Sequence, residues 1–206
     1  DAEYLFYIGC AGSFDDRAKK ITRAVTKIFN AAGLSYAVLG NDEPCDGDTA
    51  RRLGNEYLFQ SMAENAINVF TDYNVKKIIT NCPHCFNSIK NEFPQFGGHY
   101  DVFHTSEIVA RFLKDESFQI NKEAVQTIVY HDSCYLGRYN KVYLPPREII
   151  KAIPGVILRE AERNFHTGMC CGAGGGRMWM EEESDQRVST LRTEQLINVN
   201  PDIIAT

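Results

Sequence analysis

Two neighbouring cysteines, Cys170 and Cys171, begin a glycine-rich stretch that ends in Arg177. Adjacent cysteines rarely form a disulfide with each other, because their Cα atoms are only about 3.8 Å apart. They can instead offer two thiolates to one metal centre. The glycines that follow let backbone N–H groups approach a negatively charged group closely. This stretch is typical of a site for a sulfur-rich iron cluster, and the alternative is a pair of buried free cysteines beside a flexible turn.

The first half of the chain contains four further cysteines, of which only two form a tight pair. That pair is Cys82 and Cys85, and Pro83 stiffens the turn between them. Cys10 and Cys45 are single, about 35 residues apart. Four thiolates also satisfy a structural zinc site, but such sites usually contain two tight pairs. The wide spacing therefore favours an iron–sulfur cluster over zinc.

The composition is that of an ordinary globular protein, with 44% hydrophobic and 24% charged residues. The seven cysteines are an odd number, in a chain that lacks the short secreted context of a disulfide framework. We therefore expect reduced thiols that hold metal in the cytoplasm. The net charge of −5, with no basic stripe, argues against nucleic acid as a partner. No apolar run approaches the roughly 20 residues of a membrane span, and no signal peptide opens the chain.

Strands alternate with helices in the first half, which predicts a parallel sheet with crossover helices. Ligands of such sheets gather beyond the carboxyl ends of the strands. Cys10, Cys45 and Cys82 each follow the end of an expected strand, so we expect them at one edge of the sheet. The expected strands are residues 4–8, 35–39, 76–80 and 100–104, and the expected helices are residues 15–32, 49–73 and 86–92.

The second half repeats the first. The offset is 124 residues from Cys10 to Cys134 and 125 residues from Cys45 to Cys170, which indicates an internal duplication. The sequence therefore predicts an α/β fold of two pseudo-symmetric parallel-sheet domains, residues 1–118 and 119–206, with cysteine loops at the carboxyl ends of the strands. The expected strands of the second domain are residues 126–131, 155–159 and 202–206, and a helix is expected near residues 184–198.

The cysteine spacing resembles that of the cysteine-rich CCG-domain family of iron–sulfur oxidoreductases. That family includes the B and D subunits of heterodisulfide reductase and iron–sulfur subunits of glycolate and lactate oxidation systems. Its motif is a Cys, a gap in the thirties, Cys-Cys-Gly, a second such gap and Cys-x-x-Cys, usually in two copies. The match runs through nearly the whole chain. Residues 131–138 and 174–179 also resemble the long, heterodisulfide-reductase-related members.

The resemblance implies an iron–sulfur electron-transfer segment of a larger heterodisulfide-reductase-related oxidoreductase. It implies one [4Fe-4S] cluster in the first half and a second cluster, of the ordinary or the noncubane kind, in the full-length protein. It assigns no catalytic residue. The alternatives are a catalytic subunit that reduces disulfides or heterodisulfides, and a non-redox zinc scaffold. The implied ligands are Cys10, Cys45, Cys82, Cys85, Cys134, Cys170 and Cys171.

The resemblance also implies a redox partner, which would be a flavoprotein, a ferredoxin-like protein or a quinone-linked subunit. The expected location is the cytoplasm, including the cytoplasmic side of a membrane complex. Contact with a membrane is expected only through segments or partners outside this sequence.

The sequence departs from the family motif in two places. Asp46 stands where the first pair would have its second cysteine, and a solvated loop acid is favoured there over a carboxylate ligand. The offset between the halves places a second Cys-x-x-Cys about two residues beyond Thr206, so we expect the second domain to be truncated before that motif. Three other residues have two interpretations each. His84 either bonds to a cluster or faces solvent, and His131 and Asp132 serve either proton transfer and ligand support or a turn.

Overall fold

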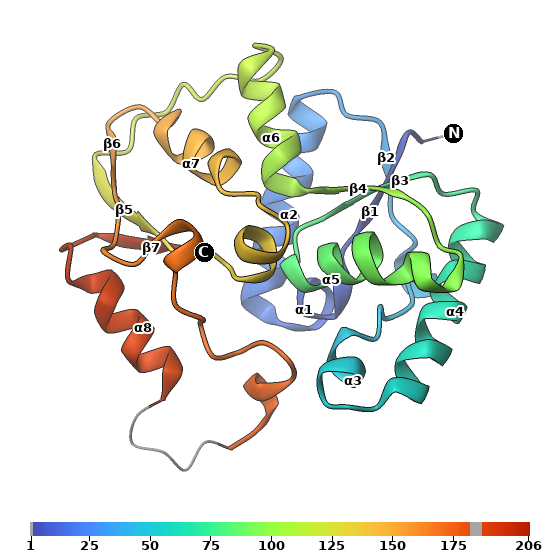
Figure 1. The fold of residues 1–206 in the computed structure, drawn as a ribbon. Coiled ribbons are helices and arrows are strands. Elements are labelled where there is room, and N and C mark those ends of the chain that lie inside the picture. Colours follow the sequence, from blue (N-terminus) through green and yellow to red (C-terminus); the bar gives the residue numbers. More distant parts are fainter. Residues whose placement is uncertain (1, 182–186) are drawn as a thin grey trace. The chain divides into compact units, whose positions relative to one another are not determined.

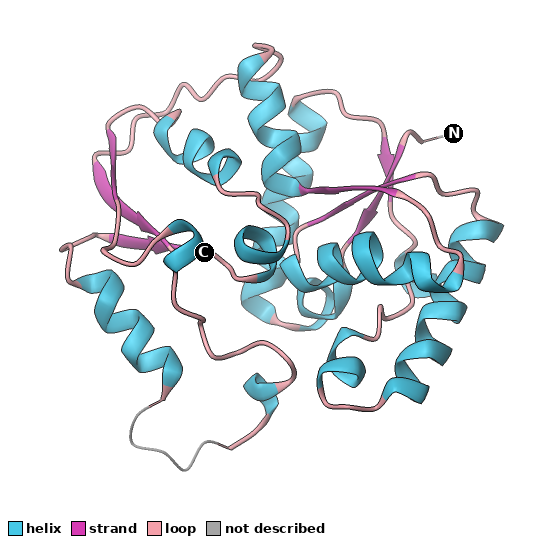
Figure 2. Cartoon of the chain, viewed as in Figure 1, coloured by secondary structure: helices cyan, strands magenta, loops and turns pink. Residues whose placement is uncertain are grey.

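The computed structural model describes residues 2–181 and 187–206, without the side chain of Trp179. The chain divides into two compact units, Asp1–Ile108 (unit 1) and Val109–Thr206 (unit 2). Figure 1 shows the ribbon coloured along the chain, and Figure 2 separates its helices from its strands. Each unit contains a sheet of its own. In the part of the chain that the structure describes, no helix has both the length and the apolar character needed to cross a membrane.

Unit 1 contains a four-stranded parallel sheet in the order β2-β1-β3-β4. Its central strand, β1, is apolar and almost completely buried, as is typical of a strand covered on both faces. Leu5 of β1 pairs with Ala37 on one side and with Ile78 on the other. The strands are β1 (Tyr4–Tyr7), β2 (Tyr36–Ala37), β3 (Lys77–Thr80) and β4 (Asp101–His104).

Helices connect these strands. The helix between β1 and β2, α2 (Asp16–Ala31), begins after Asp15, whose carboxylate accepts a hydrogen bond from the N–H of Ala18 and so caps the helix. Gly33, with a φ of 69°, follows its end. The described helices that begin in unit 1 are α1 (Gly9–Phe14), α2 (Asp16–Ala31), α3 (Asp48–Arg52), α4 (Glu56–Asp72), α5 (Pro83–Asn87) and α6 (Thr105–Lys114), with a π-helical turn at Ser88–Glu92 and 3₁₀ turns at Gly40–Asp42 and Phe93–Phe96.

The helices α2 and α4 pack on opposite faces of the sheet of unit 1. The ring of Phe6 lies 5.3 Å from that of Phe29 in α2, and the ring of Tyr7 lies 6.0 Å from that of Phe70 in α4. Phe6 and Tyr7 are successive residues of β1, so their side chains point to opposite faces of the sheet, and each packs against one helix. Full burial of such a side chain contributes about 1.5–3 kcal/mol.

Unit 2 contains a three-stranded parallel sheet in the order β6-β5-β7. Ile128 packs with Ile150 of α7, whereas the next residue, Val129, packs with Leu196 of α8. The alternation along β5 therefore places one helix on each face, as in unit 1. The elements are β5 (Gln126–Tyr130), α7 (Leu144–Lys151), β6 (Val156–Arg159), α8 (Val188–Ile197) and β7 (Ile203–Ala205), with a π-helical turn at Tyr135–Tyr139 and 3₁₀ turns at Phe165–Thr167 and Arg177–Trp179.

The two sheets repeat one arrangement, because β1 lies between β2 and β3 as β5 lies between β6 and β7. Leu5 pairs with Ile78 in unit 1, and Ile128 pairs with Ile203 in unit 2. A slip of one residue would exchange the side chains that face the two helices of each sheet, so this shared register reflects the repeated apolar pattern. The predicted α/β class with duplicated parallel sheets is confirmed. The domain boundary at residue 118 stays a prediction.

The structure corrects several of the predicted helices. The helix expected over residues 49–73 is two helices, because Gly54, with a φ of 87°, ends α3. Asn55 then caps α4 by accepting a hydrogen bond from the N–H of Leu58. The helix expected over residues 86–92 begins earlier, at Pro83, and continues as the π-helical turn.

Other elements differ in extent. The strand expected over residues 35–39 has only two residues, Tyr36–Ala37. The helices α1, α6 and α7 were not expected from the sequence. The last helix is described from Val188 onward, and its expected start near Ser184 lies outside the described residues.

Candidate functional site

Three segments carry the four cysteines of unit 1, and each follows a strand. Cys10 lies in α1 after β1, Cys45 lies in the loop after β2, and Cys82 and Cys85 follow β3. The carboxyl ends of these parallel strands meet at one edge of the sheet. A Cβ atom at Gly9 would lie 3.2 Å from the sulfur of Cys85. The segment of Cys10 therefore lies directly against the Cys-x-x-Cys loop.

Glu43 joins the segment of Cys45 to the segment of Cys10. Its Oε2 accepts a hydrogen bond from the N–H of Ile8 at 2.9 Å, and its Oε1 accepts one from the N–H of Gly9 at 2.7 Å. Burial raises the pKa of the Glu43 carboxyl, against the opposing effect of these two donors. The carboxylate holds the two loops together through bonds that do not involve the cysteines.

The four thiols of unit 1 influence one another's ionisation. Burial raises the pKa of Cys45 to about 11, and the charge of Cys10 adds to that rise. Burial also raises the pKa of Cys10, with a further contribution from the charge of Cys82. A hydrogen bond between Cys82 and Cys85 lowers the pKa of Cys82 and raises that of Cys85. Because such effects weaken with distance, the four sulfurs lie in one region of unit 1.

Asp46 lies among these thiols and is only 5% exposed, so the expectation of a solvated loop acid is wrong. Its Oδ1 lies 3.9 Å from the sulfur of Cys45. Its Oδ2 has almost no accessible surface and no hydrogen-bond partner among the described residues. Burial, with the charge of Asp48, raises the pKa of Asp46 to about 6. Because Oδ2 is inaccessible, the geometry fits a buried charge behind the sulfurs better than an iron ligand.

His84 lies inside the Cys-x-x-Cys loop and anchors it to α3. Its Nδ1 lies 2.8 Å from Oδ2 of Asp48, and Arg52 donates to Oδ1 of the same carboxylate at 3.0 Å. Burial alone would raise the pKa of Asp48, but its bonds to His84 and Arg52 lower it. The half-buried His84 is therefore a support of the loop, and a contact with a cluster stays a prediction.

The three cysteines of unit 2 also come together. Cys134 follows β5, and Cys170 and Cys171 lie in the loop after β6. Burial and the charges of the other two thiols raise the pKa of Cys134 to about 11. The N–H of Gly172 donates to the sulfur of Cys170 at 3.4 Å, and the N–H of Ala173 donates to that of Cys171 at 3.5 Å. The glycine-rich stretch thus turns backbone donors toward sulfur, as its sequence indicates.

Asp132 precedes Cys134 by two residues and forms a buried ion pair with Arg147 of α7. Nη1 and Nη2 of Arg147 donate to Oδ1 and Oδ2 at 2.7 and 2.8 Å. Oδ2 also accepts a hydrogen bond from the N–H of Phe165 at 2.7 Å. These bonds fix the segment of Cys134 to α7 and to the loop that leads to Cys170. They make Asp132 a positioning residue rather than a proton carrier.

Cys171 lines a hollow of about 170 Å³ in unit 2, together with Arg177, Met178 and Ser189. Two guanidinium-bearing side chains, those of Arg177 and Arg187, border this hollow. The lining thus places cationic side chains and a thiol around one hollow. The sequence analysis predicted no such hollow.

The sequence analysis also missed three charged residues of the two sites, Glu43, Arg147 and Arg192. None of the three belongs to a recognisable motif. Their roles depend on contacts between segments distant in the chain, so periodicity and spacing gave no signal for them.

The matched regions of the chain agree with the two repeats of the fold. The sequence model of the CCG cysteine-rich domain matches residues 4–90 and 128–206. The chain belongs to the CCG cysteine-rich domain family. Each matched region begins in the first strand of its unit and includes all the cysteines of that unit. The resemblance seen in the sequence is therefore confirmed.

Curated relatives of the chain include iron–sulfur oxidoreductases. The probable iron-sulfur-binding oxidoreductase FadF of Bacillus subtilis is 54% identical over 203 residues, which are 98% of this chain and 29% of FadF. The EtfAB:quinone oxidoreductase of Syntrophomonas wolfei is 47% identical over 99% of this chain and 29% of its own length. The D subunit of the dihydromethanophenazine:CoB--CoM heterodisulfide reductase of Methanosarcina barkeri is 27% identical over 99% of this chain and 51% of its own length. The chain thus spans about three tenths of the first two relatives and half of the third.

The cysteines of this chain fit the ligand set of an iron–sulfur cluster better than that of a single metal ion. Among the described residues, no three or more His, Cys, Asp and Glu side chains lie close enough to hold a single metal ion. A cluster takes its thiolates at different iron atoms and so spreads its ligands more widely. Cysteine thiols release their protons when they bind metal, so thiols with a raised pKa can still serve as thiolate ligands. Family, relatives and donor set together support iron–sulfur binding.

Proposed function

We propose that this CCG-domain chain is the electron-transfer segment of a larger heterodisulfide-reductase-related oxidoreductase. Unit 1 holds one [4Fe-4S] cluster, and unit 2 supplies ligands of a second. The domain boundary that separates the two sets lies near residue 118. The proposed ligands are Cys10, Cys45, Cys82 and Cys85 for the first cluster and Cys134, Cys170 and Cys171 for the second.

The observation that supports the proposal most strongly is the convergence of the cysteine segments of unit 1, where Glu43 holds the loop of Cys45 to that of Cys10 and a Cβ at Gly9 would lie 3.2 Å from the sulfur of Cys85. Three separate segments bring the four thiols of this unit to one region, and burial raises the pKa of both single cysteines. Four convergent thiolates match the ligand set of a [4Fe-4S] cluster.

A bound cluster supplies one-electron redox chemistry, with the added charge spread over several iron atoms. The residues of the chain hold the thiolates in place. Glu43 fixes the loop of Cys45 to that of Cys10, and Asp48 fixes the Cys-x-x-Cys loop through His84. The buried Asp46 adds a negative charge behind the sulfurs. A rigid ligand set of this kind keeps the rearrangement on electron transfer small.

The partner in this proposal is a flavoprotein, a ferredoxin-like protein or a quinone-linked subunit. The names of two relatives motivate this choice, because FadF and the EtfAB:quinone oxidoreductase are both described as oxidoreductases. The chain spans only 29% of each, so the rest of such a protein could provide or bind the partner. The proposed location is the cytoplasm, including the cytoplasmic side of a membrane complex.

A second candidate function is the reduction of a disulfide at unit 2. The hollow beside Cys171, with the positive charges of Arg177 and Arg187 at its border, favours it. In this case the whole protein would turn over a disulfide substrate. We expect poor turnover, because Asp46 stands in place of one cysteine of unit 1. The remaining four thiolates of that unit would hold a cluster that passes single electrons.

The experiment that tests the proposal is a reductive titration of the anaerobically purified protein, followed by visible absorbance and electron paramagnetic resonance. The proposal predicts a coloured protein that bleaches reversibly, and a weaker change in the Cys82→Ser variant. The Ser117→Ala variant, at an exposed position, should behave as the wild type. A colourless protein with stoichiometric zinc would support the scaffold instead, and brisk disulfide turnover would support the second candidate.

A further inference from the structure

Arg192 of α8 is a buried cation in unit 2, with an exposed fraction of 2%. Its Nε donates to Nδ1 of His131 at 3.0 Å. Its Nη1 donates to the carbonyl oxygen of Arg163 at 2.9 Å and to Oε1 of Gln195 at 3.1 Å. Its Nη2 is buried and has no hydrogen-bond partner among the described residues. The guanidinium is therefore held firmly, but by neutral groups.

No carboxylate within the described ranges pairs directly with Arg192. The acid that acts on it most is Asp132, and both oxygens of Asp132 already accept hydrogen bonds from Arg147. Burial lowers the pKa of Arg192, yet a guanidinium stays protonated in proteins. An unpaired buried charge is costly, so a compensating negative charge is expected near it.

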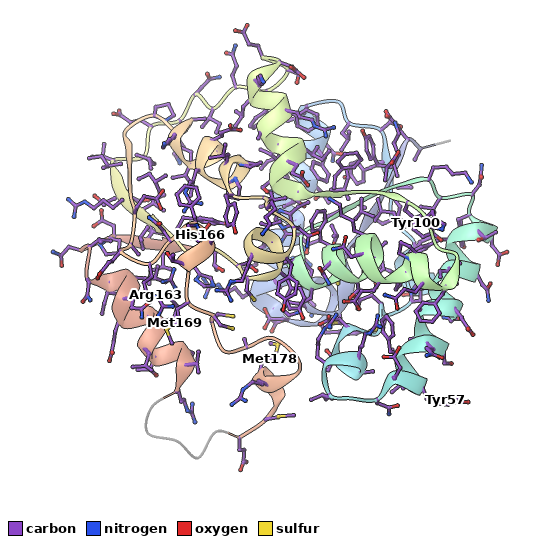
Figure 3. The ribbon with its side chains drawn as sticks, in the orientation of Figure 1. Tyr57, Tyr100, Arg163, His166, Met169 and Met178 are labelled. Carbon is purple, nitrogen blue, oxygen red and sulfur yellow. The ribbon has the colours of Figure 1, made fainter. Side chains whose placement is uncertain are left out.

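Arg192 connects the two segments that carry the cysteines of unit 2. His131, its partner at Nε, precedes Cys134 by three residues. Gln195, its partner at Nη1, donates to the sulfur of Met169 at 3.3 Å, and Met169 directly precedes Cys170. Figure 3 labels Met169 and Arg163, which lie on the segment that passes α8. The cation is therefore built into the support of both cysteine segments.

The corresponding support in unit 1 is neutral or acidic. Tyr7 precedes Cys10 by three residues, as His131 precedes Cys134, and its hydroxyl donates to the carbonyl oxygen of Pro44 at 2.6 Å. Glu43, rather than an arginine, joins the two loops. The buried charged side chains described in unit 1 include two aspartates, Asp46 and Asp48, and neither Arg nor Lys. Asp48 is paired with Arg52, and Asp132 of unit 2 is paired with Arg147. Among the described residues, the buried charge left without an ion pair is therefore the acid Asp46 in unit 1 and the cation Arg192 in unit 2.

We infer that unit 2 holds its iron–sulfur centre at a higher reduction potential than unit 1, and that Arg192 is the positioning residue that raises it. This inference rests on the proposed electron-transfer function. Reduction adds one negative charge to a centre, which a buried cation favours and a buried carboxylate opposes. Water screens the charge of Arg192 only weakly, because its side chain is buried. One electron shared by the two centres at equilibrium therefore resides in unit 2, and no covalent bond forms or breaks.

The test is a redox titration of the full-length protein that contains this chain, followed by electron paramagnetic resonance. The Cys82→Ser variant identifies the signal of unit 1, because it removes a proposed ligand of that unit alone. In the wild type, that signal should require the stronger reductant. The opposite order of the two potentials would overturn the inference, whatever the Arg192 variants do.

Variants of Arg192 test its role directly. Arg192→Gln should shift the potential of the unit 2 signal downward and leave the unit 1 signal in place, whereas Arg192→Lys, which keeps the charge, should shift it less. Lys151→Gln removes an exposed charge of unit 2 and should shift neither signal. An unchanged potential in Arg192→Gln would refute the assignment. Absence of any iron–sulfur signal in the wild type would overturn the proposed function itself, and this inference with it.

Discussion

The imidazole of His104 lies against the backbone of Asn81, with Nε2 at 3.2 Å from the carbonyl oxygen. A carbonyl only accepts, so Nε2 carries the proton, and Nδ1 is left to accept from Ser106 at 2.8 Å. Both ring nitrogens are therefore satisfied in the neutral form. Burial lowers the pKa of His104 to about 4, and the bond to Asn81 offsets only part of that change.

The lowered pKa of His104 makes the stability of unit 1 depend on pH. The unfolded chain takes up the proton near pH 6.5, whereas the folded chain resists until about pH 4. The stabilisation is thus complete above pH 6.5 and is lost as the pH falls. Between pH 7.5 and pH 5, we expect a loss of about 2 kcal/mol in the free energy of unfolding from this group.

Chemical unfolding of the apoprotein at the two pH values measures this loss. The His104→Asn variant should lose about 2 kcal/mol less than the wild type over the same interval. His99→Asn, at an exposed histidine, should lose as much as the wild type. Equal losses in wild type and His104→Asn would show that His104 takes up its proton in the folded state.

The ion pair of Arg147 and Asp132 should be essential to the stability of unit 2. Both side chains are less than 5% exposed, so Arg147→Met leaves a buried carboxylate without its counter-charge. We expect a loss of about 3 kcal/mol in the free energy of unfolding. Arg17→Met, at an exposed arginine, should change it by less than about 0.5 kcal/mol. A comparably small effect of Arg147→Met would contradict the structural role of the pair.

The sheets were predictable because their signals are local. The apolar runs that end at Ile8 and Thr80 mark strands, and the cysteines beyond them mark the edge of the sheet. Ile78 and Ile203 lie 125 residues apart in the sequence and occupy equivalent places beside β1 and β5. The break between α3 and α4 also had a local signal, Gly54 followed by a capping Asn55, which the longer apolar period obscured.

The environment of the sites was not predictable, because it depends on contacts between distant segments. Asp46 looks like a loop acid in sequence, but the next residue, Gly47, packs so closely on Phe59 of α4 that a Cβ would lie 3.0 Å from the ring. This packing places the carboxylate inside unit 1. Arg192 similarly lies in a helix with many polar residues, which is typical of a solvated face. Its burial depends on partners far along the chain, such as His131, which lies 61 residues away.

Restoring a thiol at residue 46 should change the first cluster. Asp46 is buried and its charge acts on Cys10, Cys45 and Cys85, so a cysteine there would lie among the proposed ligands. We expect Asp46→Cys to alter the electron paramagnetic resonance signal of unit 1. Asp72→Cys, at an exposed position, is the matched control and should leave the signal as it is. An unaltered signal in Asp46→Cys would mean that residue 46 does not face the cluster.

The central claim is that four cysteines of unit 1 hold one iron–sulfur cluster. Its most direct test is the content of iron and acid-labile sulfide, with a Mössbauer spectrum, of the chain in which Cys134, Cys170 and Cys171 are replaced by serine. The account predicts about four iron atoms and four sulfides per chain, with tetrahedral sulfur coordination, and a sharp loss of both when Cys10, Cys45, Cys82 or Cys85 is also replaced. Stoichiometric zinc without sulfide, or full iron content after loss of any one of these four thiols, would contradict it.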